Sequence, residues 1–291
     1  MTGTLGANSY GKSGIRLVTV TRHGSRHDLR DMTVAIRLDG DFADAHVLGD
    51  NAAVIPTDTM KNTVYALARP HAGSPPEVFA AALAHQLLDS TPRAARVIVE
   101  ISVHGWDRVR TGDRPHDHAF TRSTGSARFA RVTAGRAGVQ YEAGVMGLAL
   151  LKSGGSAFSG FLRDRYTTLQ ETDDRILATE VGATWRYEGD AIAFDFAWRT
   201  VRDALVETFI DHDSRSVQHT LYAMGNAAIE RCDQVRTIHI RMPNQHHLAV
   251  DLRPFGQENR NEVFVATAEP YGVIEAVVRR DDDEPINRLT D

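Results

Sequence analysis

Lysine is rare in this chain, and each lysine is a candidate for proton chemistry. Of the 33 lysine and arginine residues, only Lys12, Lys61 and Lys152 are lysines. A crowded or desolvated lysine can release its proton and act as a base, whereas arginine effectively stays charged. Chance is the alternative explanation at each position, and it weighs least for Lys12.

Lys12 lies in a segment that matches the phosphate-loop pattern in its letters only. Residues 6–13, GANSYGKS, show the glycines, lysine and serine of that pattern. A working loop needs a helix that begins at the lysine and points its amides at phosphate. The residues that follow, IRLVTVT, alternate as a strand does, so we expect no nucleotide loop and place Lys12 at a strand entrance.

Thirteen histidines raise the question of a metal site. His116 and His118 lie two residues apart in PHDHAF, so on a strand they share a face and could chelate zinc. His246 and His247 form a second pair. A third ligand is not evident, HExxH spacing is absent, and the single Cys232 excludes a cysteine-rich zinc site. Structural histidines are the alternative, and we expect no resident metal.

Two predicted helices begin at polar residues that could face a ligand. Thr57 and Asp58 stand at one helix start in IPTDTMKN, and Ser216 can cap a helix whose first turn holds Val217 and Gln218. Ordinary capping would explain Thr57, Asp58 and Ser216, but it does not explain Gln218.

The surrounding pattern predicts an α+β chain made of two similar halves. Alternating residues indicate strands at 14–23, 31–40 and 95–106, and apolar spacing indicates helices at 57–69 and 75–88. The second half repeats the plan, with strands near 138–152, 175–187, 234–242, 246–252 and 271–279, and helices near 195–211 and 216–231. Short connections between strands favour antiparallel sheets with paired helices on one face. We place the domains at 1–137 and 138–280, followed by an acidic tail at 281–291.

One long connection, residues 153–174, has no clear periodicity. A loop of this length inside a compact domain is usually functional or disordered. Phe158, Phe161 and Tyr166 argue against disorder.

Composition narrows the classes of protein. The chain has 291 residues, 42% of them apolar, and it shows neither a membrane-length apolar run nor a secretory leader. Most of the net charge of −5 lies in the tail, and no basic stripe indicates a nucleic-acid partner. GxGxxG after a strand and GxSxG are both absent. We expect a cytoplasmic protein without a membrane or nucleic-acid partner.

Several blocks in a fixed order resemble the urate oxidase (uricase) family of tunnelling-fold proteins. They include DNAAVIPTDTMKNTVYALA, HDHAF, LLKSGGSAFSGFLRDRYTTLQETDDRILAT, TWRY, MPNQHHLAVDLRPFGQENRNEVF and PYGVIEA. The resemblance implies two tunnelling-fold (T-fold) halves in each subunit, dimers that close a β-barrel, and a homotetramer with active sites at subunit interfaces. It implies oxidation of urate by O2 and water to 5-hydroxyisourate and hydrogen peroxide, with no metal and no organic cofactor.

The same resemblance assigns residues that hold the substrate. It implies that Arg175 and Gln218 grip the edge of the purine and that Phe158 stacks on its plane. It further implies that Val217 contributes a backbone N–H and Leu169 a packing contact.

The remaining roles concern protons and oxygen. Lys12, Thr57 and His246 match the family's proton-handling group, Asn244 matches the residue that faces the O2 or water site, and Asp58 contributes a backbone N–H. A zinc-dependent purine or pterin hydrolase on the same fold and a purine-binding protein without catalysis are the rival functions. Removal of metal by a chelator would abolish the activity of a hydrolase but not that of a cofactor-free oxidase. The presence of Lys12, Thr57 and His246 together argues against a protein that only binds purines.

Overall fold

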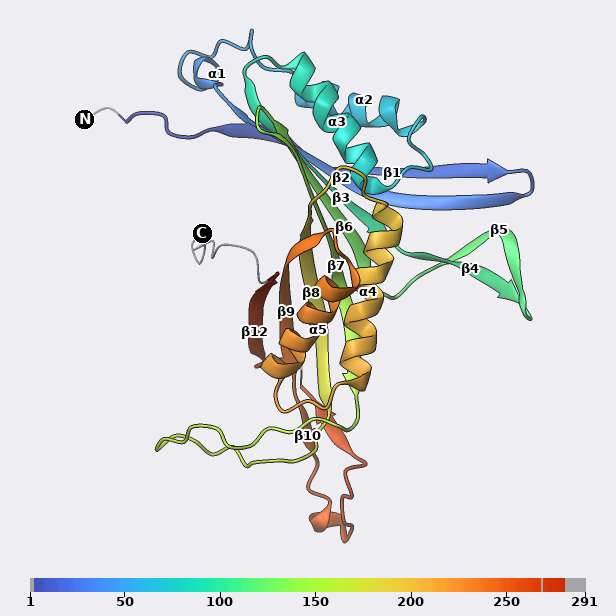
Figure 1. The fold of residues 1–291 in the computed structure, drawn as a ribbon, viewed down its shortest axis with the longest axis vertical. Helices are drawn as coiled ribbons and strands as arrows, with labels where there is room; N and C mark the ends of the chain where they lie inside the picture. Colours follow the sequence, from blue (N-terminus) through green and yellow to red (C-terminus); the bar gives the residue numbers. More distant parts are fainter. Residues whose placement is uncertain (1–2, 268, 281–291) are drawn as a thin grey trace. The chain divides into compact units, whose positions relative to one another are not determined.

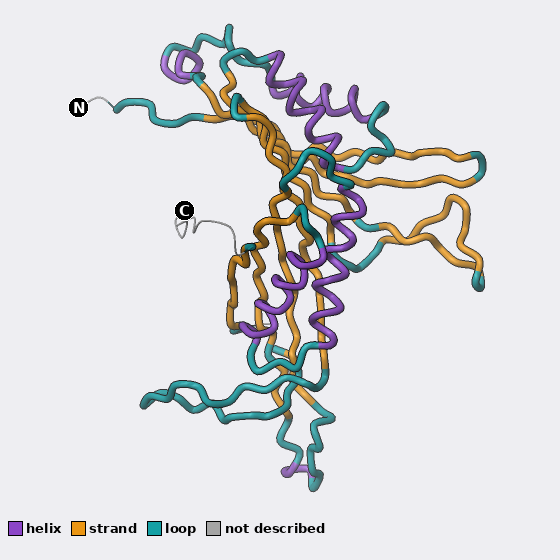
Figure 2. Tube along the Cα trace, in the orientation of Figure 1, coloured by secondary structure: helices purple, strands orange, loops and turns teal. Residues whose placement is uncertain are grey.

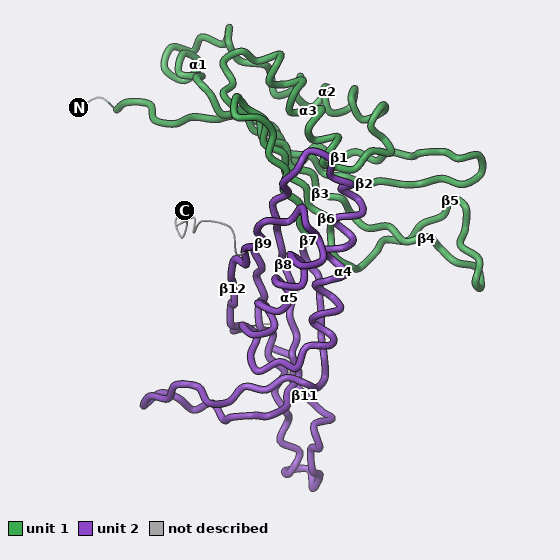
Figure 3. The backbone as a smooth tube through the Cα atoms, in the orientation of Figure 1, with its two compact units in different colours: residues 1–144 green, residues 145–291 purple. Residues whose placement is uncertain are grey.

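The computed structural model describes residues 3–267 and 269–280. These residues form two compact units, 1–144 and 145–291, which divide within strand β7 (Gly138–Lys152) (Figure 3). The seam inferred from sequence, residue 137, lies at the turn before β7. The acidic tail at 281–291 lies outside the described residues.

The first unit is an antiparallel sheet with helices on one face (Figure 1). Its sheet runs β1-β2-β3-β6, from β1 (Ser9–His23), β2 (Arg26–Gly40), β3 (Ala94–His104) and β6 (Ala127–Gly135). The helices are α1 (Ala43–Val47), α2 (Thr57–Ala68) and α3 (Pro76–Ser90), and a separate hairpin is formed by β4 (Trp106–Thr111) and β5 (Arg114–Arg122).

Periodicity explains how α2 meets this sheet. Its buried residues Met60, Val64 and Ala68 lie four apart and therefore form one stripe. The stripe packs into a core with alternate residues of β2 and β3, such as Val34 and Val99, both fully buried. The start of α2 is thereby held beside β1, which carries Lys12.

The second unit repeats the antiparallel plan. Its elements are the end of β7, β8 (Leu177–Tyr187), α4 (Phe194–Asp211), α5 (Val217–Arg231), β9 (Val235–Gln245) and β12 (Gly272–Arg279). A small antiparallel pair, β10 (His247–Ala249) with β11 (Phe264–Ala266), and a 3-10 turn, η1 (Arg253–Phe255), lie between β9 and β12. Figure 2 shows the long loop between β7 and β8 as an irregular segment.

A close contact brings α5 onto its sheet. A Cβ atom at Gly225 would lie 2.5 Å from Cγ2 of Val278 in β12. Only glycine therefore lets α5 approach β12 this closely, and the depth of α5 decides where its first turn lies.

The α+β prediction is confirmed, and so are the antiparallel strands and the paired helices. The predicted strand at 246–252 is wrong beyond residue 249. There the Asn259 side chain binds the carbonyls of Val250 and Val263, and Asp251 binds Arg253, so the chain turns. No helix among the described residues is long and apolar enough to cross a membrane.

Candidate active site

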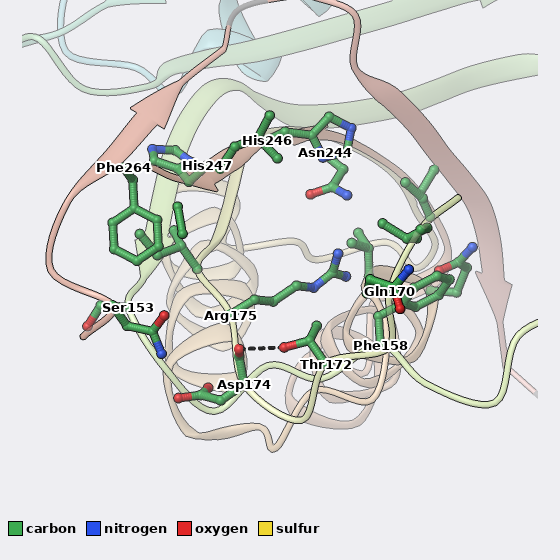
Figure 4. A pocket seen from close by; sticks show the side chains of 18 residues that line it. Ser153, Phe158, Gln170, Thr172, Asp174, Arg175, Asn244, His246, His247 and Phe264 are labelled. Carbon is green, nitrogen blue, oxygen red and sulfur yellow. Dashed lines mark hydrogen bonds between the residues drawn. The ribbon is translucent and has the colours of Figure 1, made fainter. Parts of the chain in front are cut away.

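A cavity of about 560 Å³ opens in the second unit, within the range typical of small-molecule sites (Figure 4). Four segments meet around it: the loop after β7, the first turn of α5, the end of β9 with β10, and the β11–β12 region. The cavity brings together seven of the residues assigned from sequence: Phe158, Leu169, Arg175, Val217, Gln218, Asn244 and His246.

Backbone pairing gives the loop after β7 a defined shape. The Phe158 N–H donates to the Thr172 carbonyl at 2.8 Å, and the Thr172 N–H donates back to Phe158 at 3.1 Å. Phe158 stacks on Phe161 with ring centroids 5.0 Å apart. The loop therefore presents the Phe158 ring at a fixed place beside the cavity.

Arg175 supplies a partly buried positive charge. Its guanidinium carbon lies 5.2 Å from the centre of the Phe158 ring, and its side chain points into the cavity (Figure 4). Its Nε is buried without a hydrogen-bond partner in the part of the chain that the structure describes. Burial lowers the pKa of Arg175, because desolvation disfavours a charge. A buried N–H donor without an acceptor is costly, so this position suits a ligand with carbonyl or anionic oxygens.

The first turn of α5 adds amide donors to the same cavity. Ser216 is the N-cap, as predicted, and its hydroxyl accepts the His219 N–H at 3.1 Å. Val217 and Gln218 precede His219, so their N–H groups have no acceptor within the helix. The helix start therefore offers two amides and a partial positive charge to a bound anion.

The opposite wall carries Asn244 and His246. Asn244 lies near the end of β9, where β12 and β8 flank it through Gly272 and Thr179. Figure 4 shows Asn244 across the cavity from Arg175. His246 occupies the break between β9 and β10, and Thr267 binds its carbonyl at 2.9 Å.

Two further residues line this wall, His247 and Phe264. The sequence raised His247 only as a member of a histidine pair, and it did not single out Phe264. Simple alternation would send His246 and His247 to opposite faces, but the chain breaks between β9 and β10 and both line the cavity. Phe264 reaches it because β11 pairs with β10, with Phe264 opposite Ala249. Phe264 lies in ENRNEVF, the end of one of the family blocks, and that block is the sequence signal that could have identified it.

Lys12 lies in the first unit, inside β1 and beside a backbone irregularity. A Cβ at Gly11 would lie 1.9 Å from the Ile36 carbonyl oxygen, so Gly11 permits a close approach of β1 and β2. The pairing shifts register between Lys12 and Ile15, with Gly14 at φ 71°. Such bulges re-aim side chains, and here the glycines serve the strand rather than a phosphate.

Thr57 and Asp58 open α2, in the same unit as Lys12. Pro56 is the N-cap and makes no side-chain hydrogen bond, so neither residue caps the helix. The Asp58 carboxylate instead binds the side chains of Lys61 and Asn62. The hydrogen bond and charge of Lys61 lower the pKa of Asp58, and the charge of Lys12 contributes as well. Lys12 and the amides of this helix start therefore belong to one polar region of the first unit.

The two histidines of HDHAF do not form a complete metal site. The rings of His116 and His118 lie 4.7 Å apart, and the His27 ring lies 5.7 Å from that of His118. Within residues 3–267 and 269–280, no group of three or more potential ligands is placed to hold a metal ion. The carbonyls of His116 and Asp117 accept from Arg108, which indicates a structural task for this segment.

Comparison with known proteins gives consistent matches. A family model described as Uricase matches residues 8–133 and 141–275. The uricase of Arthrobacter globiformis is 45% identical over 285 residues, which cover 97% of this chain and 93% of that protein. The uricase of Aspergillus flavus is 33% identical over 290 residues, covering 94% and 96% respectively.

Solved structures agree with these sequence matches. The crystal structure of the Arthrobacter globiformis uricase has a TM-score of 0.93 at 44% identity and covers 98% of both chains. A mutant urate oxidase from Bacillus sp. TB-90 has a TM-score of 0.82 at 22% identity, covering 94% of this chain and 99% of that one. The second match is a likeness of fold.

Proposed function

The chain belongs to the uricase family, and from that premise we propose that it oxidises urate with O2 by means of protein side chains alone. The observation that carries the proposal is the second-unit cavity, in which the partly buried guanidinium of Arg175 lies over Phe158 beside the first turn of α5. A flat, electron-rich anion with carbonyl and N–H edges has the shape and chemistry that this arrangement binds.

Substrate binding follows from the groups present. Arg175 offers a planar pair of donors to two acceptors, and the Gln218 amide offers both a donor and an acceptor. Phe158 stacks on the purine plane, and the Val217 N–H donates to its edge. Leu169 closes one side of the cavity by packing.

The reaction requires that the bound purine lose protons before it gives up electrons. Each proton that leaves a ring nitrogen makes the purine a stronger electron donor. Lys12 serves as the base, and Thr57 and His246 pass the proton on. The amides at the start of α2, including that of Asp58, stabilise the negative charge that develops.

The electrons and atoms balance without another oxidant. Urate, O2 and water give 5-hydroxyisourate and hydrogen peroxide: urate loses two electrons and O2 gains them together with two protons. The oxygen added to the purine comes from water. Asn244 faces the place that O2 or water occupies.

We also propose that one site needs two copies of the chain. Among the described residues, the cavity is lined by the second unit, whereas Lys12, Thr57 and Asp58 belong to the first. A homotetramer whose dimers close a barrel would bring the first unit of one subunit to the second unit of another. The cytoplasm is the compartment we propose, consistent with a single cysteine.

The direct test uses protein treated with a strong chelator and incubated with urate in air. We expect loss of the purine's ultraviolet absorbance together with formation of peroxide. Elemental analysis and an absorption spectrum of the same sample are the controls. A stoichiometric metal or redox centre, or activity lost on chelation and restored by zinc, would favour the hydrolase instead. Tight purine binding without peroxide would favour a binding protein.

A further inference from the structure

Lys152, one of the three lysines, has no role in the proposed reaction, but it directly precedes Ser153, which lines the cavity. It is the last residue of β7 and is partly buried. Its Nζ donates a hydrogen bond to the carbonyl of His212, the residue that ends α4. The ammonium therefore ties the start of the loop after β7 to residues 212–216, which join α4 to α5.

Backbone hydrogen bonds continue this connection toward the cavity. The Ser214 N–H donates to the Gly155 carbonyl at 3.0 Å, and the Ala157 N–H donates to the Ser214 carbonyl at 2.7 Å. Ala157 precedes Phe158, and residue 216 precedes Val217. The segments 155–157 and 212–216 thus deliver the stacking ring and the helix amides to the same cavity.

A buried chain of hydrogen bonds stiffens the connecting segment. The Thr220 hydroxyl donates to Ser214 at 2.8 Å, and the Ser214 hydroxyl donates to the Ser216 carbonyl at 3.0 Å. The Thr220 oxygen is 3.2 Å from Nδ1 of His212, and its proton is already used, so Nδ1 must be the donor there. Residues 212–216 are held at both ends, by Lys152 and by α5.

Lys152 also acts on the charge next to Arg175. The carboxylates of Asp213 and Asp174 both interact with its ammonium, opposing the lowering of the Lys152 pKa by burial. The Ser156 N–H donates to Asp174 Oδ1 at 3.4 Å. The Asp174 and Arg175 side chains point in different directions (Figure 4), and within the described chain Arg175 forms no ion pair.

We propose that Lys152 is a positioning residue for urate binding, because its ammonium holds 212–216 against 155–157, the segments that deliver the stacking ring and the helix amides to the cavity. The proposal rests on the proposed function for the identity of the ligand. Lys152 is not among the residues that line the cavity, so its removal should weaken binding before it alters the chemical step.

The test compares three substitutions with a matched control in the intact oligomer. Lys152→Met removes the charge and the donor, Lys152→Gln keeps a donor, and Lys152→Arg keeps the charge. The control is Arg231→Met. Arg231 is the last residue of α5, far from the cavity end of that helix, and its guanidinium binds Glu207 of α4. For each we would measure the Kd of a urate analogue that cannot be oxidised, KM and kcat for urate, and hydrogen exchange of residues 155–158 and 214–218.

We expect Lys152→Met to raise both Kd and KM at least about tenfold, with a smaller loss of kcat. Exchange in both segments should rise, Lys152→Gln should show part of each effect, and Lys152→Arg should stay within about threefold of wild type. Arg231→Met should leave all four quantities unchanged. If Lys152→Met does not fold, Lys152→Gln is judged by the same criteria.

A purely structural role predicts something different: fewer active molecules, hence lower kcat at unchanged Kd and KM. That result, or exchange at the wild-type level in the neutral variants, would overturn the proposal. Failure of the wild-type protein to oxidise urate would instead refute the proposed function, and the exchange measurements would still test the positioning by Lys152.

Discussion

At the scale of single residues, the cavity contains a cation placed at a cost to the free protein. The partly buried Arg175 has a lowered pKa and a buried Nε without a partner among the described residues, so its interactions are incomplete until a ligand arrives. Binding sites commonly keep such unsatisfied groups, because the ligand completes them.

Replacing Arg175 with methionine should therefore separate stability from binding. We expect Arg175→Met to lower kcat/KM for urate at least about 100-fold, because a charge-assisted pair of hydrogen bonds is lost. Its Tm without ligand should equal or exceed that of wild type, because a buried N–H donor without a partner is removed. Thermal unfolding and steady-state kinetics measure the two effects, and a clear fall in Tm would show that Arg175 has a structural partner.

Lys12 differs from Arg175 in its proposed role: Arg175 stays charged, whereas Lys12 must give up its proton. Lys12→Arg keeps a positive charge that cannot act as a base at neutral pH, so turnover should fall at least about 100-fold. Binding of an inert purine analogue should stay within about threefold. Stopped-flow kinetics and calorimetry measure the two quantities, and near-normal turnover would refute the proton role of Lys12.

At the scale of elements, the start of α5 has both a structural and a functional part. Ser216 satisfies the His219 N–H, which leaves the earlier amides for a ligand. The contact between Gly225 and Val278 sets the depth of the whole helix.

Loss of this cap should be measurable by itself. Ser216→Ala should lower the free energy of unfolding by about 1 kcal/mol. Chemical denaturation measures this change. The control is Ser90→Ala at the end of α3, where the hydroxyl donates to the Gln86 carbonyl and the expected change is within about 0.5 kcal/mol. Equal stability of Ser216→Ala and wild type would mean that water replaces the cap at no cost.

The segment between α4 and α5 should respond to acid through His212. Burial lowers the pKa of His212, with further contributions from the charges of His219 and Lys152, while Asp213 opposes them. The folded state therefore binds this proton less readily than the unfolded state does. His212 contributes stability that is fully present above pH ~6.5 and is lost as the pH falls through the lowered pKa.

We expect the free energy of unfolding to fall less between about pH 7 and pH 5 in His212→Asn than in wild type. Urea denaturation across that range measures the slope. His85→Asn, on an exposed face of α3, is the control and should follow the wild-type curve. Parallel curves for His212→Asn and wild type would contradict the assignment.

At the scale of the whole molecule, the proposed residues are divided between the two units of one chain. Lys12 and Thr57 lie in the first unit and Arg175 in the second. If one site combines units from different subunits, two inactive variants should complement each other in a mixed oligomer.

Lys12→Met and Arg175→Ala provide this test. Each homo-oligomer should be nearly inactive, whereas co-expressed mixtures should recover up to about a quarter of wild-type activity per site when the subunits assemble at random. Mass spectrometry verifies that the oligomers are mixed. No recovery in verified mixed oligomers would place each complete site within one chain.

The sequence determined the local elements of this protein because the signals for them are local. Alternation in IRLVTVT predicts β1, and the serine before VQH predicts where α5 starts. Family blocks identified seven of the residues that line the cavity, including Phe158 and Asn244, in segments far apart along the chain.

The tertiary structure alone decided how those residues meet. The pairing of Phe158 with Thr172 and the bond from Lys152 to His212 join groups whose separation in sequence carries no periodic signal. The same holds for the buried Nε of Arg175, which has no partner among the described residues. Such contacts depend on which segments pack side by side and how closely, as at Gly225. Periodicity reports which face of an element is buried; the partner of each buried group follows only from the folded chain.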